Sequence, residues 1–300
     1  MNRNAPQTGK RQDIELLRVI SAFGIVWFHS GATGNDIAYS GLIIFLVLSL
    51  YLAAQSTGAP KSVFHRAKRL LVPWLVWFTF YGAINLARHR PFISFENGIV
   101  TGILTGPSTH LWYMPFIFIM LLAFDWLRVR LSPRLIGYAS AALAIIVFIT
   151  AYTWRPWSLQ VGAPYAQFAH ALNGVLTGVF LAYYFNLPKF YRSVLLLVNL
   201  ALAMYLAILP MPGVGIPYLL AISLSAVVLL YGRYQPKGIN FNWLSECTLG
   251  IYLIHPFCFM IIYYFHIVDG AGVPLVVFVA STISVMLLKR VAPGFSKYAV

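Results

Sequence analysis

The chain has 300 residues, of which 60% are hydrophobic and 9% are charged, and its mean hydropathy is +0.78. A soluble domain of this size carries roughly 25% charged residues, so the composition excludes an ordinary soluble protein and indicates that most of the surface contacts lipid. The net charge of +14 does not indicate nucleic-acid binding, because the sequence has no RNA- or DNA-binding motif and basic loops beside membrane spans are common.

Ten apolar segments approach the length of ~20 residues that a transmembrane helix needs. We expect these helices at residues 14–32, 38–55, 70–88, 110–127, 135–152, 166–185, 193–209, 216–232, 247–266 and 272–289. The predicted fold class is an all-α integral membrane protein, a bundle of about ten transmembrane helices with both termini in the cytoplasm. The longest outer connections are expected at 89–109 and 153–165, the first as a loop or as a short interfacial or re-entrant helix.

The basic residues give the orientation, because Lys and Arg collect on the cytoplasmic side of membrane proteins. With the N-terminus inside, only Arg88, Arg90 and Arg155 of the 21 Lys and Arg residues fall on the outer side. One missing or extra span would scramble this segregation, so it supports both the count and the orientation. The expected organisation is a basic cytoplasmic tail, a transmembrane domain and a second cytoplasmic tail, at residues 1–13, 14–289 and 290–300.

The first predicted helix carries Arg18 near its entrance and His29 eleven residues later. At about 100° per residue both lie on one face, ~16 Å apart along the axis, which places His29 beyond the middle of the membrane. Arg18 alone is typical of a snorkelling anchor. His29 alone is either a histidine hydrogen-bonded across helices or a general base. Glu15 lies one turn before Arg18 and can pair with it.

Few ionisable groups lie deep in the predicted spans, and these are chiefly His29, His170 and His255. Ionisable groups inside a membrane are costly and usually mark a functional site. A zinc site is not supported, because the three histidines lie on different helices with no Cys or carboxylate beside them. We therefore assign no metal ligands.

A basic stretch, VFHRAKRLLVPW at residues 63–74, precedes the third predicted span. Arg66 and Arg69 are one turn apart on a shared face, and with Lys68 they can grip a phosphate group. The alternative is an ordinary topology signal that contacts anionic lipid, and spacing alone favours this alternative.

An aromatic stretch, THLWYMPF at residues 109–116, opens the fourth predicted span at the outer surface. Trp112 and Tyr113 belong either to the aromatic belt of the membrane interface or to a platform that stacks on sugar rings.

A second short motif, LGIYLIHPF at residues 249–257, lies in the ninth predicted span. Pro256 lacks a backbone donor and leaves the carbonyl of Tyr252 without its usual partner. A kink there is expected to direct Tyr252 and His255 into the bundle.

Together these motifs resemble the acyltransferase 3 family of integral membrane acyltransferases. The matching elements are the Arg-x10-His motif with a preceding acidic residue (Glu15, Arg18, His29), the Arg-x-x-Arg motif (Arg66, Arg69), the His-Leu-Trp-aromatic element (110–113) and the Tyr-Leu-x-His-Pro element (252–256). The four occur in order across nearly the whole chain. One departure is Leu50, which stands where the family has glycine near the end of the second span.

The resemblance implies an enzyme that moves an acyl group, often acetyl, from cytoplasmic acyl-CoA to a hydroxyl of a glycan or lipid-linked sugar, with no bound cofactor. It implies His29 as general base or as an acylated nucleophile, with Arg18 and Glu15 beside it. It implies donor binding by Arg66, Lys68 and Arg69. Residues expected to bind the acceptor or support the site are His110, Trp112, Tyr113, Asn173, Tyr252 and His255. The last three are also the candidate oxyanion stabilisers.

Two other classes stay open at this stage. A transporter or flippase also fits many spans, although no internal repeat or deep intramembrane carboxylate is evident. A non-catalytic lipid or glycan binder would keep the aromatic residues but has no need of the Arg-x10-His pair. For an enzyme, the expected setting is a bacterial inner membrane, and an exopolysaccharide, a lipopolysaccharide unit and a lipid-linked sugar remain as acceptors.

Overall fold

The computed structural model describes residues 10–56, 58–209, 211–232 and 239–300. Every regular element within these ranges is a helix, which confirms the all-α part of the predicted fold. Most of the expected tail at 1–13, with Arg3, and the inner-side residues Arg233 and Lys237 lie outside the described residues.

The helices of the described ranges overlap all ten predicted segments. In chain order they are α1 (Gln12–Ser30), α2 (Asn35–Ala38), α3 (Ser40–Gln55), α4 (Val63–Ala87), α5 (Ile99–Thr105), η1 (Thr109–Trp112), α6 (Tyr113–Arg128), α7 (Pro133–Ile149), α8 (Ala151–Val161), α9 (Tyr165–Tyr183), η2 (Tyr184–Asn186), α10 (Lys189–Ala207), α11 (Ile216–Ala226), η3 (Val227–Tyr231), α12 (Asn242–Ser245), α13 (Thr248–Tyr264), η4 (Gly270–Gly272), α14 (Val273–Val291) and α15 (Pro293–Ala299).

Within the described chain, six helices are long and apolar enough to cross a membrane. They are Asn35–Gln55, Val63–Ala87, Thr109–Arg128, Tyr165–Asn186, Lys189–Ala207 and Gly270–Val291, and a seventh follows if the bent pair α7–α8 is one span. Two other apolar helices, Ile216–Tyr231 and Thr248–Tyr264, are shorter, and α1 carries three charged residues in its first two turns. The chain is therefore a multi-pass membrane protein, while the count of ten spans and the cytoplasmic termini stay predictions.

Two predicted boundaries are wrong. Helix α4 begins at Val63, seven residues before the expected start at 70, because Ser62 caps it by accepting a hydrogen bond from the His65 amide at 3.2 Å. The connection expected at 153–165 is mostly helix α8, which turns by 76° from α7. Trp154 secures this bend by donating its Nε1–H to the carbonyl of Val147 at 2.8 Å. The other long connection contains the short helix α5, as one of its two alternatives predicted.

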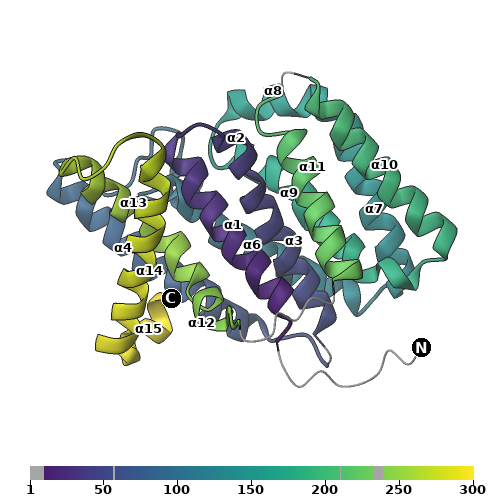
Figure 1. Cartoon of the computed structure of the whole chain (residues 1–300), viewed down its shortest axis with the longest axis horizontal. Helices are drawn as coiled ribbons and strands as arrows, with labels where there is room; N and C mark the ends of the chain where they lie inside the picture. The colour runs from purple at the N-terminus through teal and green to yellow at the C-terminus, as the bar shows by residue number, and fades with distance from the viewer. Residues whose placement is uncertain (1–9, 57, 210, 233–238) are drawn as a thin grey trace.

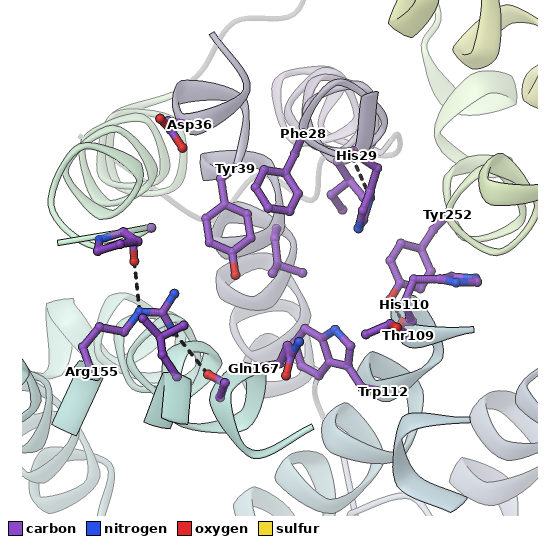
Figure 2. Close-up of a pocket in the computed structure, with 16 residues that line it drawn as sticks. Phe28, His29, Asp36, Tyr39, Thr109, His110, Trp112, Arg155, Gln167 and Tyr252 are labelled. Carbon is purple, nitrogen blue, oxygen red and sulfur yellow. Dashed lines mark hydrogen bonds between the residues drawn. The ribbon is translucent and has the colours of Figure 1, made fainter. Parts of the chain in front are cut away.

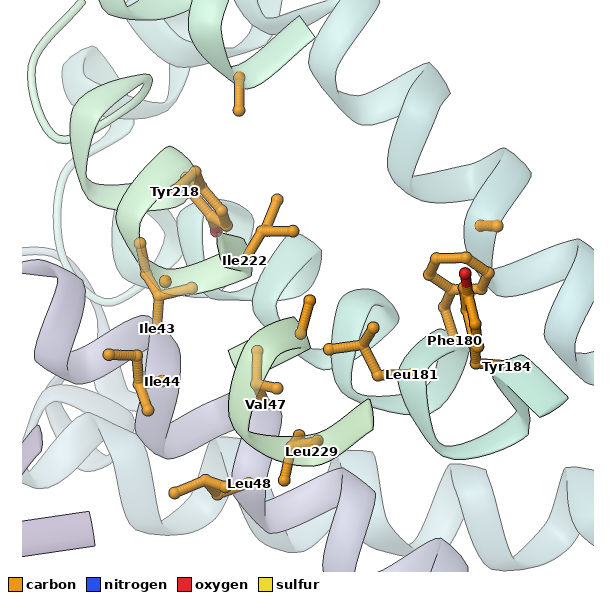
Figure 3. Close-up of a cluster of buried hydrophobic side chains, with 14 of the residues drawn as sticks. Ile43, Ile44, Val47, Leu48, Phe180, Leu181, Tyr184, Tyr218, Ile222 and Leu229 are labelled. Atoms are coloured by element: carbon orange, nitrogen blue, oxygen red, sulfur yellow. The ribbon is translucent and has the colours of Figure 1, made fainter. Parts of the chain in front are cut away.

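Helix α3 lies in the middle of the bundle and packs against α1, α9 and α11 (Figure 1). Figure 3 shows its apolar side chains meeting those of α9, α11 and η3 in one buried cluster. Glycines allow the close approach on the α1 side, where a Cβ at Gly41 would lie 2.5 Å from the carbonyl oxygen of Ser21. This packing fixes α1, which carries His29, against the centre of the molecule.

The departure at Leu50 has a structural counterpart on the neighbouring helix. Leu50 is fully buried, and Gly178 of α9 lies against it, so that a Cβ at Gly178 would be 3.1 Å from the Leu50 Cβ. The small residue that α3 lacks at this point is supplied by α9, and the two helices remain closely packed.

Candidate active site

Three histidines from distant parts of the chain meet at one end of α1. His29 lies in the last turn of α1, His110 lies in η1 and His255 lies in α13. The ring centroids of His29 and His255 are 4.9 Å apart, and those of His110 and His255 are 5.5 Å apart. His170, which the sequence grouped with His29 and His255, is not part of this cluster, because its Nε2 donates to the carbonyl of Gly213 at 2.7 Å.

The hydrogen bonds assign the tautomer of each neutral ring. His255 Nδ1 lies 2.7 Å from the carbonyl oxygen of Tyr252, which Pro256 leaves without a backbone donor, so Nδ1 carries the hydrogen. His255 Nε2 must then accept, and it lies 3.1 Å from His29 Nδ1. His29 Nδ1 therefore donates, to this nitrogen and to the carbonyl of Ile25 at 3.0 Å. The lone pair of His29 is left on Nε2.

His110 is held by hydrogen bonds on both ring nitrogens. Its Nε2 donates to the carbonyl of Leu253 at 3.3 Å, and its Nδ1 accepts from the hydroxyl of Ser108 at 2.9 Å. The hydroxyl of Tyr252 donates to the carbonyl of His110, which ties η1 to α13. No group of three or more His, Cys, Asp or Glu in the described ranges is arranged to hold a metal ion.

A cavity of about 420 Å³, called the outer cavity after the membrane side that the basic residues predict for it, opens beside the histidines (Figure 2). His29, His110 and Tyr252 line one side of it, and the indole of Trp112 lies on an adjacent wall. His255 does not line the cavity but stands behind His29, where it orients the ring. A histidine lone pair thus faces a chamber with aromatic walls, the arrangement that a general base for a hydroxyl substrate needs.

The outer cavity also contains groups that the sequence did not identify as candidates. Tyr39 stacks on His170 with ring centroids 4.8 Å apart, and Arg155 and Gln167 line the wall opposite His29. The only sequence signal for Arg155 was its place among the few basic residues on the expected outer side.

A second cavity of about 600 Å³, called the inner cavity after its predicted membrane side, lies on the other side of the bundle core. Its basic lining residues are Lys10, Arg18, Lys61, His65, Arg66, Arg69, Arg128 and Lys297. A concave surface with this excess of one charge attracts anions and raises their local concentration. The positive charge acts on Glu246 at the rim, because the hydrogen bond and charge of Lys10 hold the pKa of that carboxyl below its ordinary value.

The predicted phosphate-binding residues are not equivalent. Arg66 is buried and paired with Asp125, with its Nε 2.5 Å from the carboxylate, while Arg128 also pairs with Asp125 at 3.0 Å. Arg69 lines the cavity and forms no ion pair within the described residues. Lys68 is not among the lining residues, and its Nζ lies 5.9 Å from an aromatic ring centroid instead.

The expected pair at the start of α1 is present. Arg18 Nη1 lies 3.2 Å from a carboxylate oxygen of Glu15, and the hydroxyl of Ser245 donates to the same carboxylate. Arg18 lines the inner cavity, whereas His29 on the same helix lines the outer one. The two residues of the Arg-x10-His motif therefore line different cavities.

Two tyrosines lie between the chambers. Tyr113 lines the inner cavity, Tyr252 lines the outer one, and their ring centroids are 5.3 Å apart. The hydroxyl of Tyr113 is 3.1 Å from the hydroxyl of Ser49 on α3. Asn173, a predicted supporting residue, is buried on α9 and lines neither cavity.

Comparison with known proteins identifies the family of the chain. The acyltransferase 3 family model, described as an acyltransferase domain, matches residues 11–289, from α1 into the last turn of α14. Comparisons with curated proteins and with solved structures found no match. Because the family model covers nearly the whole chain and includes all four sequence motifs, this membrane protein belongs to the acyltransferase 3 family.

Proposed function

We propose that the protein transfers an acyl group, acetyl in the simplest case, from cytoplasmic acyl-CoA to a hydroxyl of a glycan or lipid-linked sugar in a bacterial inner membrane. Family membership supports the reaction class. The observation that carries the proposal is the lone pair of His29 Nε2 beside the outer cavity, with its tautomer fixed by His255. An exopolysaccharide, a lipopolysaccharide unit or a lipid-linked sugar supplies the hydroxyl.

The inner cavity suits the donor. Coenzyme A carries several phosphate groups, and guanidinium groups bind phosphates through paired hydrogen bonds. Arg69 and Arg18 offer charged donors in this cavity, and Arg66 is held in place by Asp125. Lys68 has at most a long-range role, because it does not line the cavity.

The thioester must travel from the inner cavity to His29. The tyrosine pair, Tyr113 and Tyr252, lies between the two chambers, and the narrow pantetheine arm is the part of the donor that would pass them. In this proposal the ring of Tyr113 turns aside when the donor binds, and the phosphates stay behind among the arginines.

The chemical step then needs one base. His29 Nε2 accepts the hydroxyl proton of the acceptor as that oxygen attacks the thioester carbonyl carbon. The carbon–sulfur bond breaks, and the proton on Nε2 passes to the coenzyme A thiolate. The Nδ1–H bonds to Ile25 and His255 stabilise the imidazolium that forms between these events. General-base help of this kind contributes ~10²–10⁴-fold in rate.

Acylation of His29 itself is the second route to the same product. The two routes differ in kinetic order, since the direct route requires donor and acceptor to be bound together. Intersecting initial-rate lines support the direct route, and parallel lines with a trapped acyl-enzyme support the histidine intermediate.

The first test uses membranes containing wild type, His29→Ala or His266→Asn at matched folded amounts, with labelled acetyl-CoA and a crude surface-glycan fraction. His266 is exposed beyond α13 and is the matched histidine control. We expect labelled glycan with wild type and the control and none with His29→Ala. Equal labelling by all three would remove His29 from the reaction. Unimpaired acylation with loss of glycan export would favour a transporter.

A further inference from the structure

We propose that the acceptor is an anionic sugar and that Arg155 binds its carboxylate or phosphate group at the wall of the outer cavity opposite His29. This inference rests on the proposed function for the statement that a sugar enters the cavity. It adds the charge class of that sugar and a specificity-determining residue.

Arg155 is unusual because its charged side chain is buried without an acidic partner in the described chain. It is 7% exposed, and two of its nitrogens are tethered to backbone carbonyls: Nε to Pro212 at 2.9 Å and Nη1 to Ala166 at 3.5 Å (Figure 2). No ion pair to Arg155 occurs within the part of the chain that the structure describes. An arginine stays charged, and burying its charge without a counter-ion is costly. A bound anion removes that cost.

The third guanidinium nitrogen is available to a ligand. Nη2 makes no hydrogen bond to the described residues, and it lies 3.3 Å from the point where a Cβ of Gly213 would stand. Gly213 has a φ of +73°, and a Cβ there would also lie 2.8 Å from the ring of Tyr39, so only glycine fits between this ring and the guanidinium. Asp36, the acidic residue of the cavity wall, is exposed and forms no salt bridge with Arg155.

A second group in the same wall also lacks a protein partner. Gln167 lines the cavity, and its buried Oε1 has no hydrogen-bond partner among the described residues. A buried amide oxygen without a donor costs about 1–3 kcal/mol, so a ligand hydroxyl that donates to it would be favoured. The hydroxyl of Tyr39 is already used, since it donates to His170 Nδ1 at 3.4 Å.

These groups define how an acceptor would lie. Figure 2 shows Arg155 on one side of the cavity and His29 on the other, with Gln167 and Trp112 between them. A sugar ring with its anionic group on Arg155 and one hydroxyl on Gln167 would extend across the chamber, so that another hydroxyl reaches His29. The volume of about 420 Å³ falls within the range of ~300–1,000 Å³ that is usual for small-molecule sites.

The test measures binding of three matched glycosides to the purified full chain: methyl glucuronoside, methyl glucoside 6-phosphate and neutral methyl glucoside. We expect at least one anionic glycoside to bind ten times more tightly than the neutral one, and the tighter of the two identifies carboxylate or phosphate as the source. Arg155→Gln should abolish this preference, while Arg155→Lys and the exposed control Arg134→Gln should keep most of it.

Equal binding of all three glycosides to wild type, no binding of any of them, or a preference that survives Arg155→Gln would overturn the inference. If Arg155→Gln does not fold, the comparison of the three glycosides on wild type still decides the charge class of the acceptor. Binding needs no turnover, so it is also measured with His29→Ala. Anionic preference without acetyl transfer would reject the proposed function and keep the site, and transfer to neutral and anionic sugars alike would do the reverse.

Discussion

A single proline sets the tautomer of the proposed base. Pro256 leaves the carbonyl of Tyr252 free, this carbonyl takes the Nδ1–H of His255, and the remaining nitrogen of His255 accepts from His29. These hydrogen bonds connect the missing backbone N–H of Pro256 in α13 to the lone pair on His29 Nε2 in α1. The motif spacing pointed to His29 and His255 separately, and only the fold shows that one orients the other.

The first prediction concerns His255 as a positioning residue. Replacing it with Leu removes one acceptor of the His29 Nδ1–H, and a hydrogen bond to a charged group contributes about 1.5–3 kcal/mol. We expect kcat to fall by about 10- to 100-fold with an unchanged KM for acetyl-CoA. His255→Gln, which retains an acceptor, should recover part of kcat. Equal kcat in wild type and His255→Leu would show that Ile25 alone orients the base.

The second prediction separates two neighbouring basic residues. Arg69 lines the inner cavity without an ion pair in the described chain, whereas Lys68 does not line it. Loss of one charged phosphate contact weakens binding roughly tenfold or more. Arg69→Ala should therefore raise KM for acetyl-CoA by that factor and leave kcat unchanged, while Lys68→Ala should change neither. A larger KM effect from Lys68→Ala would mean that the donor lies on another face of α4.

At the scale of elements, close helix contacts hold the chambers in place. Helix α3 touches α1 and α9 through glycines, and the buried Leu50 is accommodated by Gly178. The sequence showed that Leu50 departs from the family pattern, but it could not show the compensation, because Gly178 is remote in the chain.

The third prediction tests this contact. A Cβ at Gly178 would lie 2.5 Å from the carbonyl oxygen of Val47, so Gly178→Ala must separate α3 from α9. Overpacking of this kind costs about 1–3 kcal/mol, and we expect a lower unfolding temperature. Gly294→Ala is the control, because a Cβ there meets nothing within 4 Å. An unchanged unfolding temperature for Gly178→Ala would show that the two helices separate without cost.

The apolar pattern predicted most helices. It failed where other interactions, such as side-chain hydrogen bonds, stabilise a helix. Every predicted segment overlaps a helix, because a run of apolar residues can be recognised in the sequence without knowledge of its tertiary contacts. Helix α8 escaped prediction because Arg155 and Pro156 interrupt its apolar pattern, and its stability comes from contacts with residues such as Val147. The position of the Arg155 side chain depends on Pro212 and Ala166, which no spacing rule relates to it.

At the scale of the whole molecule, the motif residues divide between two chambers. Arg18 and Arg69 face the basic inner cavity, His29 and His110 face the outer cavity, and the tyrosine pair lies between them. The sequence indicated which residue types take part, and the sides of the membrane that it assigns to them stay predictions. It did not predict that the motif residues divide between two cavities, because Tyr113 and Tyr252 come together only when α6 and α13 pack.

The fourth prediction concerns this partition. Tyr113→Trp places a larger ring where the pantetheine arm would pass, so kcat should fall while the Kd of coenzyme A in the inner cavity is unchanged. Tyr113→Phe keeps the ring and loses only the contact with Ser49, and it should retain most of kcat. A fall in coenzyme A affinity with Tyr113→Trp would place Tyr113 inside the donor site rather than on the path.

The most direct measurement of the central claim uses sealed proteoliposomes with labelled acetyl-CoA on one side and the glycan acceptor on the other. The proteoliposomes are separated into those whose protein has its Arg69 end on the outside of the vesicle and those that have it on the inside. We expect labelled acceptor only when the donor is on the Arg69 side, and none with His29→Ala at the same amount of folded protein. Transfer that persists in His29→Ala, or that requires donor and acceptor on the same side, would contradict it.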